Sequence, residues 1–198
     1  GAKVLQIRSV EFASKYQMPL RVLSSFNKSG GTLITKEDNS LESAVISGIT
    51  CSNDDSKIIL RNVPDTPGIA AKILSPISEA GIDVDVIVQN VGSDKSTDFT
   101  FTVKNNLSEK AAKILKDLTE DFGGGEVELV KDVSKVSVVG VGMKSHAGVA
   151  AQMFGALANK KINIDMISTS EIKISVVVAK DKAEEAVIAL HDEFELDK

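Results

Sequence analysis

DTPGIAAKIL, residues 65–74, has the pattern of a turn followed by an amphipathic helix, and SHAGVAAQMF, residues 145–154, repeats that pattern further along the chain. In both segments a glycine, Gly68 or Gly148, precedes a branched apolar residue and two alanines. The first segment carries an aspartate before its glycine, whereas the second carries none. This similarity indicates that the chain contains two copies of one structural unit.

The repeat extends beyond these two segments. An offset of 80 brings 57–87 onto 137–167, and an offset of 75 then brings 99–115 onto 174–190. A unit of this length is too long for a solenoid repeat and suits a duplicated small domain. At the first offset the aligned pairs include Ile82 with Ile162, Asp85 with Asp165, and Ile87 with Ile167.

Each copy reads as strand, helix, strand, strand and helix. Asp65 or Thr66 is expected to cap the first helix of the first copy, and Gly81 to end it. The spacing of apolar residues predicts the remaining elements. In the first copy these are strands at 57–63, 82–90, 98–104 and 126–133 and a helix at 108–118. In the second copy they are strands at 135–142, 163–170 and 172–179 and helices from Ser145 and at 182–194.

The second copy lacks a fourth strand, because the four residues after Phe194 are too few to form one. The remaining strand-like segment, AVISGITCS at 44–52, lies upstream of the first copy. We therefore expect it to complete the second unit, so that the first unit, 57–133, is inserted into a second unit made of 44–52 plus 134–198. The predicted fold class is α+β, with two βαββαβ units.

The bulk composition narrows the classes of function. The 198 residues are 42% hydrophobic and 26% charged, with a net charge of −5, which is typical of a globular chain. The acidic balance argues against nucleic acid and anionic membranes as partners. No apolar run approaches the length of a membrane span, and one cysteine, Cys51, offers no disulfide or metal cluster. We expect a cytoplasmic chain with Cys51 as a small buried residue.

The sequence predicts no catalytic residues, metal or cofactor. The segment GVGMKSHAG, 140–148, has the wrong glycine spacing for a phosphate-binding loop. His146 and His191 have no nearby cysteine or paired acids. Phe99 and Phe101 alternate on one strand as RNA-stacking residues do, but without basic neighbours they are interpreted as core residues.

The helix openings are the candidate binding sites. A helix N-terminus offers free N–H groups and partial positive charge to a carboxylate, and Gly68 allows close approach to the backbone. Asp65 beside it would hold an ammonium group, so the pair describes a receptor for a free α-amino acid. The alternative is that Asp65 is only a helix cap and Gly68 only a turn residue. In the second copy Ser145 replaces the acid, so the two sites would bind differently.

A βαββαβ unit with a D-x-P-G turn after its first strand resembles the ACT domain, a module that binds amino acids. More specifically, VPDTPGIAAKI, IDVDVIVQNV, VGVGMKSHAGVAAQMF and KINIDMISTSEIKISVVV resemble the tandem ACT region of the aspartokinase family. The resemblance covers nearly all of 44–195. It implies two ferredoxin-like ACT domains in tandem, the first inserted into the second.

The start of the chain adds to this resemblance. Residues 1–26 and 31–34 are similar to the last helix and strand of the aspartokinase catalytic domain, with a helix that ends before Pro19 and a strand in LRVLSSF. The resemblance therefore implies that 1–43 is a remnant of the kinase domain and a linker. The nucleotide and aspartate sites of that domain are missing, so the chain resembles a regulatory β subunit or a regulatory fragment.

The resemblance further implies feedback inhibition by lysine and threonine, bound between unlike ACT units of two chains in a homodimer. One site would combine Asp65, Gly68, Ile69, Ala70 and Gln89 with Asn163 and Ile164. The other would combine Ser145, His146, Gly148, Val149 and Ala150 with Asp83, Val84 and Asp85. Threonine is assigned to the Asp65 site, whose other groups are short and neutral. Lysine is assigned to the other site, where Asp83 or Asp85 would meet its second ammonium.

Three other functions stay open at this point. A complete aspartokinase subunit would need the nucleotide loop that this chain lacks. A free-standing amino-acid sensor would have no use for the kinase-like segment at 1–34. A pure dimerisation module would bind no ligand at Asp65. The regulatory interpretation names the aspartokinase catalytic domain or α subunit as the partner.

Overall fold

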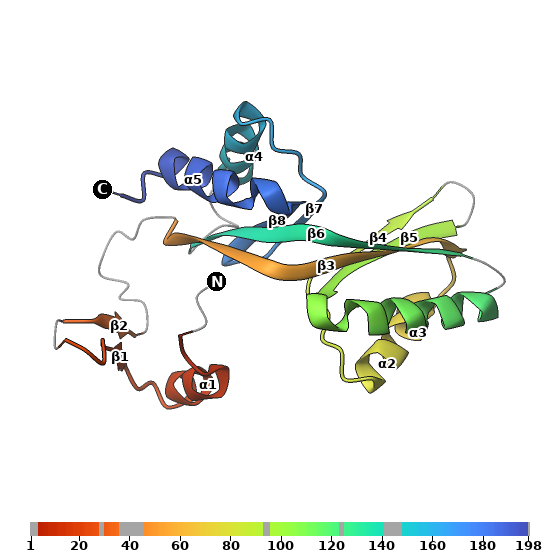
Figure 1. Cartoon of the computed structure of the whole chain (residues 1–198), viewed down its shortest axis with the longest axis horizontal. Helices are drawn as coiled ribbons and strands as arrows, with labels where there is room; N and C mark the ends of the chain where they lie inside the picture. Colours follow the sequence, from red (N-terminus) through yellow and green to blue (C-terminus); the bar gives the residue numbers. More distant parts are fainter. Residues whose placement is uncertain are drawn as a thin grey trace. The chain divides into compact units, whose positions relative to one another are not determined.

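The computed structural model describes residues 4–27, 30–35, 46–92, 96–122, 125–140 and 148–197. The chain divides into two compact units, Gly1–Ala44 and Val45–Lys198. The second unit holds both copies of the repeat (Figure 1).

The first unit is small and largely exposed. Helix α1 (Ile7–Lys15) ends before Pro19, as predicted, and is followed by a hairpin of β1 (Leu20–Val22) and β2 (Thr32–Ile34). The predicted strand in LRVLSSF is thus only three residues long. None of the described residues of α1 is buried. The unit therefore leaves much apolar surface in contact with water, including Val4, Ile7, Phe12, Tyr16, Met18, Leu23, Phe26 and Leu33.

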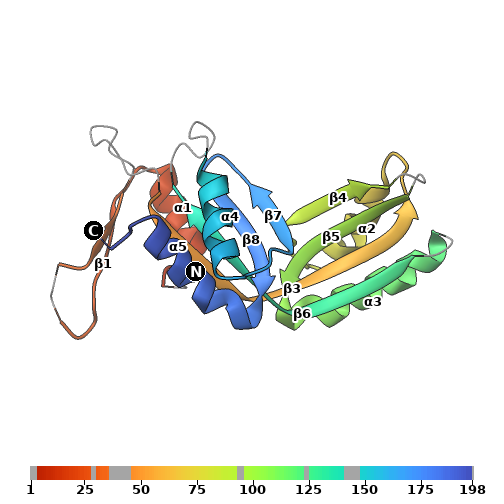
Figure 2. The same ribbon diagram turned by 90° about the horizontal axis from the view of Figure 1, so that it is seen from above.

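The second unit is built on one antiparallel sheet of six strands, in the order β4-β5-β3-β6-β8-β7. Figure 2 shows this sheet running without a break from β4 to β7. Its strands are β3 (Gly48–Pro64), β4 (Ile87–Val91), β5 (Ser96–Lys104), β6 (Glu126–Val139), β7 (Met166–Thr169) and β8 (Lys173–Ala179). Its helices are α2 (Ile69–Glu79), η1 (Asn105–Leu107), α3 (Ser108–Asp121), α4 (Val149–Asn159), η2 (Lys180–Lys182) and α5 (Ala183–Glu193).

Two long central strands join the repeats, which corrects the sequence prediction. The strands expected at 44–52 and 57–63 form one strand, β3, and those expected at 126–133 and 135–142 form one strand, β6. The register of β3 against β6 shifts on either side of Asp55. The polar residues there, which suggested a break between two strands in the sequence, therefore lie within one strand. Gly48–Ser52 pairs with Lys135–Val139. The domain boundaries drawn from the sequence stay a prediction.

Each repeat has its own apolar core. Ile58, Leu60, Phe99 and Phe101 are buried beneath α2 and α3, which confirms that the two phenylalanines are core residues. The core of the other repeat packs beneath α4 and α5 (Figure 1). A third, smaller cluster draws residues from both repeats and so joins them. Its members are Val86, Val133, Met166 and Val177.

The repeat is visible in the pattern of burial as well as in the sequence. Residues 81–90 and 161–170 show the same order of buried, half-buried and exposed side chains, at the predicted offset of 80. In the strands that precede the helices the offset is 78. Phe101 and Val176 are equivalent at the offset of 75, and their strand partners are Ile58 and Val136, which lie 78 residues apart. Lys57 and Lys135 are therefore equivalent, which the single offset of 80 predicted from the sequence did not show.

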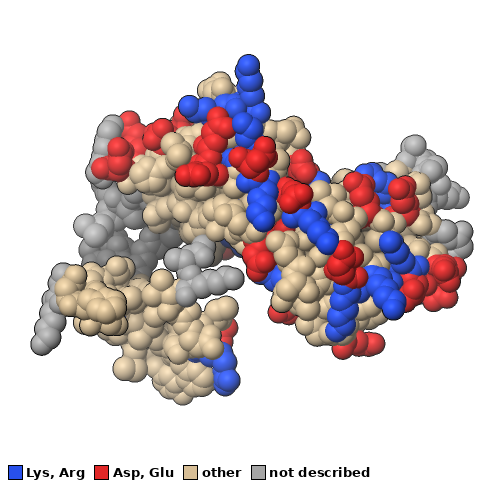
Figure 3. Space-filling model, viewed as in Figure 1, with Lys and Arg blue, Asp and Glu red and all other residues tan. Residues whose placement is uncertain are grey.

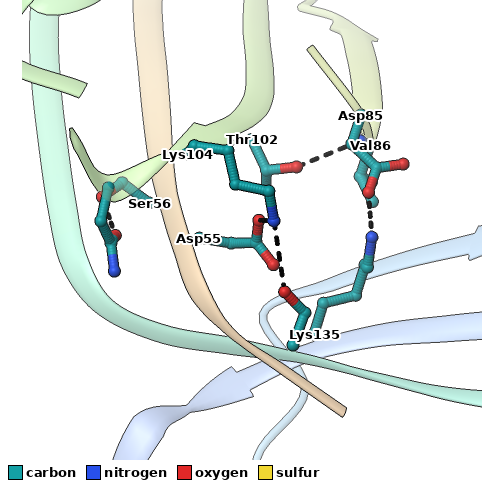
Figure 4. Close-up of polar contacts among 9 residues, drawn as sticks. Asp55, Ser56, Asp85, Val86, Thr102, Lys104 and Lys135 are labelled. Carbon is teal, nitrogen blue, oxygen red and sulfur yellow. Dashed lines mark hydrogen bonds and ion pairs between the residues drawn. The ribbon is translucent and has the colours of Figure 1, made fainter. Parts of the chain in front are cut away.

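The two repeats differ where the central strands cross between them. Asp55 is 3% exposed, and its Oδ1 lies 2.6 Å from Nζ of Lys104 on the neighbouring strand (Figure 4). Its other oxygen is buried and has no hydrogen-bond partner among the described residues. The equivalent cross-strand pair in the second repeat is apolar, Val133 with Ala179. The lysine thus neutralises a charge that only the first repeat carries.

Replacing Lys104 with methionine should lower the free energy of unfolding by about 1–3 kcal/mol, because the Asp55 carboxylate would stay buried without its cation. The double variant Asp55→Val/Lys104→Ala copies the Val133–Ala179 pair and should recover stability to within about 1 kcal/mol of the parent chain. Urea unfolding measures both variants. A double variant no more stable than the single one would contradict this interpretation.

Candidate ligand-binding site

The two helix openings share an unusual backbone conformation. Gly68 precedes α2 with φ +91°, and Gly148 precedes α4 with φ +112°, both in the left-handed region that favours glycine. A Cβ at either position would meet no atom within 4 Å, so the backbone angle rather than crowding requires glycine. The predicted N-caps were wrong. Helix α2 begins at Ile69, beyond Asp65 and Thr66, and no side chain caps it.

This conformation leaves backbone donors free at the start of α2. The Ile69 N–H donates to the Thr66 carbonyl at 3.1 Å, which closes the turn. The next N–H groups, of Ala70 and Ala71, have no acceptor among the described residues. Free donors at a helix N-terminus attract an anion such as a carboxylate.

An open pocket of about 430 Å³ lies at this helix start. It is lined by Asp65, Thr66, Pro67, Gly68, Ile69, Ala70 and Gln89. The fold thus brings Gln89, on the edge strand β4, to the D-x-P-G turn that the sequence singled out. Asp65 is exposed, and its carboxylate makes no hydrogen bond or ion pair with another described residue. The free acid of Asp65 and the free N–H donor of Ala70 therefore line one pocket, and the N–H of Ala71 follows in the first turn of α2.

The remaining residues predicted for this site lie elsewhere in the chain. Asn163 and Ile164 precede β7 in the second repeat and do not line the pocket. In the second predicted site, Gly148, Val149 and Ala150 form the start of α4, while Ser145 and His146 fall outside the described residues. Asp83, Val84 and Asp85 lie in the loop between α2 and β4.

Three other features of the described part of the chain bear on its function, namely its cysteine, the groups that could bind a metal ion, and its helices. Cys51 is half-buried rather than buried as predicted, and this partial burial, aided by the charge of Asp55, raises the pKa of its thiol and so disfavours the nucleophilic thiolate. No group of three His, Cys, Asp or Glu residues among those described could hold a metal ion. None of the described helices has the length and apolar character of a membrane span. Acidic and basic side chains are intermixed on the face of the second unit shown in Figure 3.

Comparison with known proteins decides the family. Residues 58–120 and 136–194 each match the ACT domain. The ligand-free regulatory subunit of aspartate kinase from Thermus thermophilus is 41% identical, with a TM-score of 0.73 over 76% of this chain and 99% of that one. The chain belongs to the aspartokinase family, as a regulatory region with two ACT domains. An aspartate kinase of Pseudomonas fluorescens (strain SBW25) is 58% identical over all 198 residues.

The chain spans about half of that Pseudomonas relative, 48% of its length. A crystal structure of aspartokinase alpha and beta subunits contains a chain that is 42% identical, with a TM-score of 0.71 over 76% of this chain and 99% of that one. The predicted α+β fold with two ferredoxin-like ACT domains is confirmed, and the insertion of the first into the second stays a prediction.

The two ACT domains exchange ion pairs that sequence reasoning missed. Asp85 of the first ACT domain accepts from Lys135 of the second (Figure 4), and Asp165 of the second accepts from Lys57 of the first at 2.5 Å. The Asp85 carboxylate is therefore already paired, unlike that of Asp65 or Asp83 among the described residues. The sequence held one sign of these pairs, because a lysine begins the predicted first strand of each copy, at 57 and at 135. These lysines are 78 residues apart, so the offset of 80 did not align them.

Replacing Gly68 with alanine should lower the free energy of unfolding by about 1–2 kcal/mol, because alanine disfavours the left-handed conformation. Gly155, inside α4 and open to solvent, is the matched control. The same substitution there should raise stability by about 0.5–1 kcal/mol, since glycine is a poor helix residue. Thermal unfolding measures both variants. If the two unfolding midpoints shifted in the same direction, the left-handed conformation assigned to Gly68 would be contradicted.

Proposed function

We propose that this chain is the feedback-regulatory part of an aspartokinase, which binds threonine at the Asp65 pocket and lysine at the second helix opening. The observation that carries the proposal is that the free carboxylate of Asp65 and the free N–H donor of Ala70 line one pocket at the start of α2. An α-amino acid carries the complementary charges, an ammonium and a carboxylate, on one carbon. The N–H donors of Ala70 and Ala71 would bind its carboxylate, and Asp65 its ammonium.

The groups around each pocket set the choice of amino acid. Beyond Asp65 the first pocket offers only neutral groups, of which Gln89 and Thr66 are polar. Threonine, with one short hydroxyl, suits that lining. Lysine needs a second anion, and the loop at 83–85 supplies one. Because Asp85 is paired with Lys135, Asp83 is the acid that would meet the second ammonium.

A homodimer would complete each site. Asn163 and Ile164 do not line the pocket of their own chain, so a second chain would supply them. The outer edges of β4 and β7 have no strand partner among the described residues, and these strands expose the equivalent residues Ile87 and Ile167, which are 45% and 44% exposed. Unpaired edge strands with exposed apolar residues favour association with a second chain.

The first unit supplies a surface for the catalytic partner. An apolar hollow of about 900 Å³ lies between α1 and the hairpin, and its lining includes Val4, Ile7, Val10 and Ile34. A surface of this kind is stable when another domain covers it. We assign that role to the aspartokinase catalytic domain or α subunit, to which the kinase reaction belongs.

Regulation follows from differential binding. An effector that bridges two chains stabilises the paired state by its extra affinity for that state. In the complete enzyme this preference would couple to the kinase domain with a free energy of about 1–3 kcal/mol, the usual range for allosteric coupling.

The variant Asp65→Asn should weaken threonine binding about tenfold or more, because a hydrogen bond to a charged group contributes roughly 1.5–3 kcal/mol. Isothermal titration calorimetry measures the affinity. The matched control is Asp117→Asn on α3, which removes the same charge from an exposed position outside the pocket and should leave affinity unchanged. If Asp65 is only a turn residue, Asp65→Asn will bind threonine as the parent chain does, and the proposed function fails.

A further inference from the structure

We propose that Lys57 and Lys135 are positioning residues for the two effector sites, each holding the binding loop of the opposite ACT domain. This inference rests on the proposed function, since the loops at 163–165 and 83–85 are the half-sites that a second chain would use. Neither lysine is a predicted contact of the effector.

The two loops are anchored in the same way by the backbone. The Asp165 N–H donates to the Val177 carbonyl at 2.8 Å, and the Asp85 N–H donates to the Thr102 carbonyl at 3.1 Å. These bonds fix where each loop joins the sheet. They do not fix the carboxylate at the end of each loop, which extends from an exposed residue.

Each carboxylate is instead held by a lysine from the other domain. Lys57 on β3 reaches Oδ2 of Asp165 at 2.5 Å, and Lys135 on β6 reaches Asp85. The lysine side chains are only 12% and 15% exposed, so each is largely packed within the protein and held there by its neighbours. A fixed cation beneath a surface carboxylate orients that carboxylate and the residues bonded to it.

The Asp165 carboxylate also contacts Asn163, which is a predicted effector contact. Its Oδ1 accepts from the side-chain amide of Asn163 at 3.5 Å, while its Oδ2 is held by Lys57. Lys57 therefore positions Asn163 indirectly, from the first ACT domain. The geometry of the half-site consequently depends on how the two ACT domains are placed against each other.

The two loops do not depend on their lysines equally. In the first ACT domain the Thr102 hydroxyl accepts from the Val86 N–H at 3.1 Å, beside the loop that Lys135 holds (Figure 4). The equivalent position in the second ACT domain is Val177, which has no hydroxyl. Loss of Lys57 should therefore disturb its loop more than loss of Lys135 disturbs the other.

The test compares Lys57→Met and Lys135→Met by isothermal titration calorimetry with threonine and with free lysine. The first effector is defined as the amino acid whose binding Asp65→Asn weakens. Lys57→Met should weaken that effector roughly tenfold and leave the other within about twofold, because the two sites share no contact. Lys135→Met should show the reverse selectivity with a smaller loss. Lys131→Met, which breaks an exposed ion pair with Glu109, is the control and should change neither affinity.

The outcomes separate this inference from the proposed function. If the parent chain binds neither amino acid, the proposed function fails first. If the parent chain binds them and Lys57→Met binds both normally, or loses both alike, the positioning role is overturned while the proposed function stands. Should Lys57→Met fail to fold, Asp165→Asn removes the same ion pair from its more exposed end and must show the same selective loss. Lys57→Arg, which keeps the cation, should restore binding of the first effector to within about threefold.

Discussion

The antiparallel pairing of β3 with β6 is the constraint on which the rest of the structure depends. Each strand contributes residues to the apolar cores of both repeats, so the two repeats share a single sheet. Register in that pair fixes register in β5 and β8, and the loops at 83–85 and 163–165 donate hydrogen bonds to these two strands, at Thr102 and Val177. Because side chains alternate along a strand, a slip of one residue would turn Lys57 and Lys135 away from their partners. The geometry of the predicted half-sites therefore depends on the register of the two central strands.

A second constraint acts locally at each helix opening. The left-handed glycine lets the chain leave a strand and start a helix with its first N–H groups uncapped. In most helices a side chain satisfies one of these donors. At α2 the donors stay free in the described structure, and an exposed acid lies in the same pocket. The pocket thus keeps unsatisfied polar groups at the surface, where a ligand can reach them.

The sequence predicted what depends on local pattern and missed what depends on pairing over long distances. The repeat, the order of the elements and the turn around Gly68 are local, and the structure contains them. The N-cap at Asp65 was wrong because a left-handed glycine shifts the helix start, which composition does not reveal. The long strand β3 was missed because the polar residues before Asp55 separate its two apolar segments in the sequence. The lysine pairs span 108 and 50 residues, and no periodicity links such positions.

The central claim is that effector sites are completed between two chains. Sedimentation velocity of the chain with threonine, with lysine and with methionine as control tests this claim most directly. We expect threonine or lysine to shift the chain towards dimer and methionine to leave it unchanged. Sedimentation that is unchanged by both threonine and lysine would contradict it, because a ligand held between two chains must favour their association.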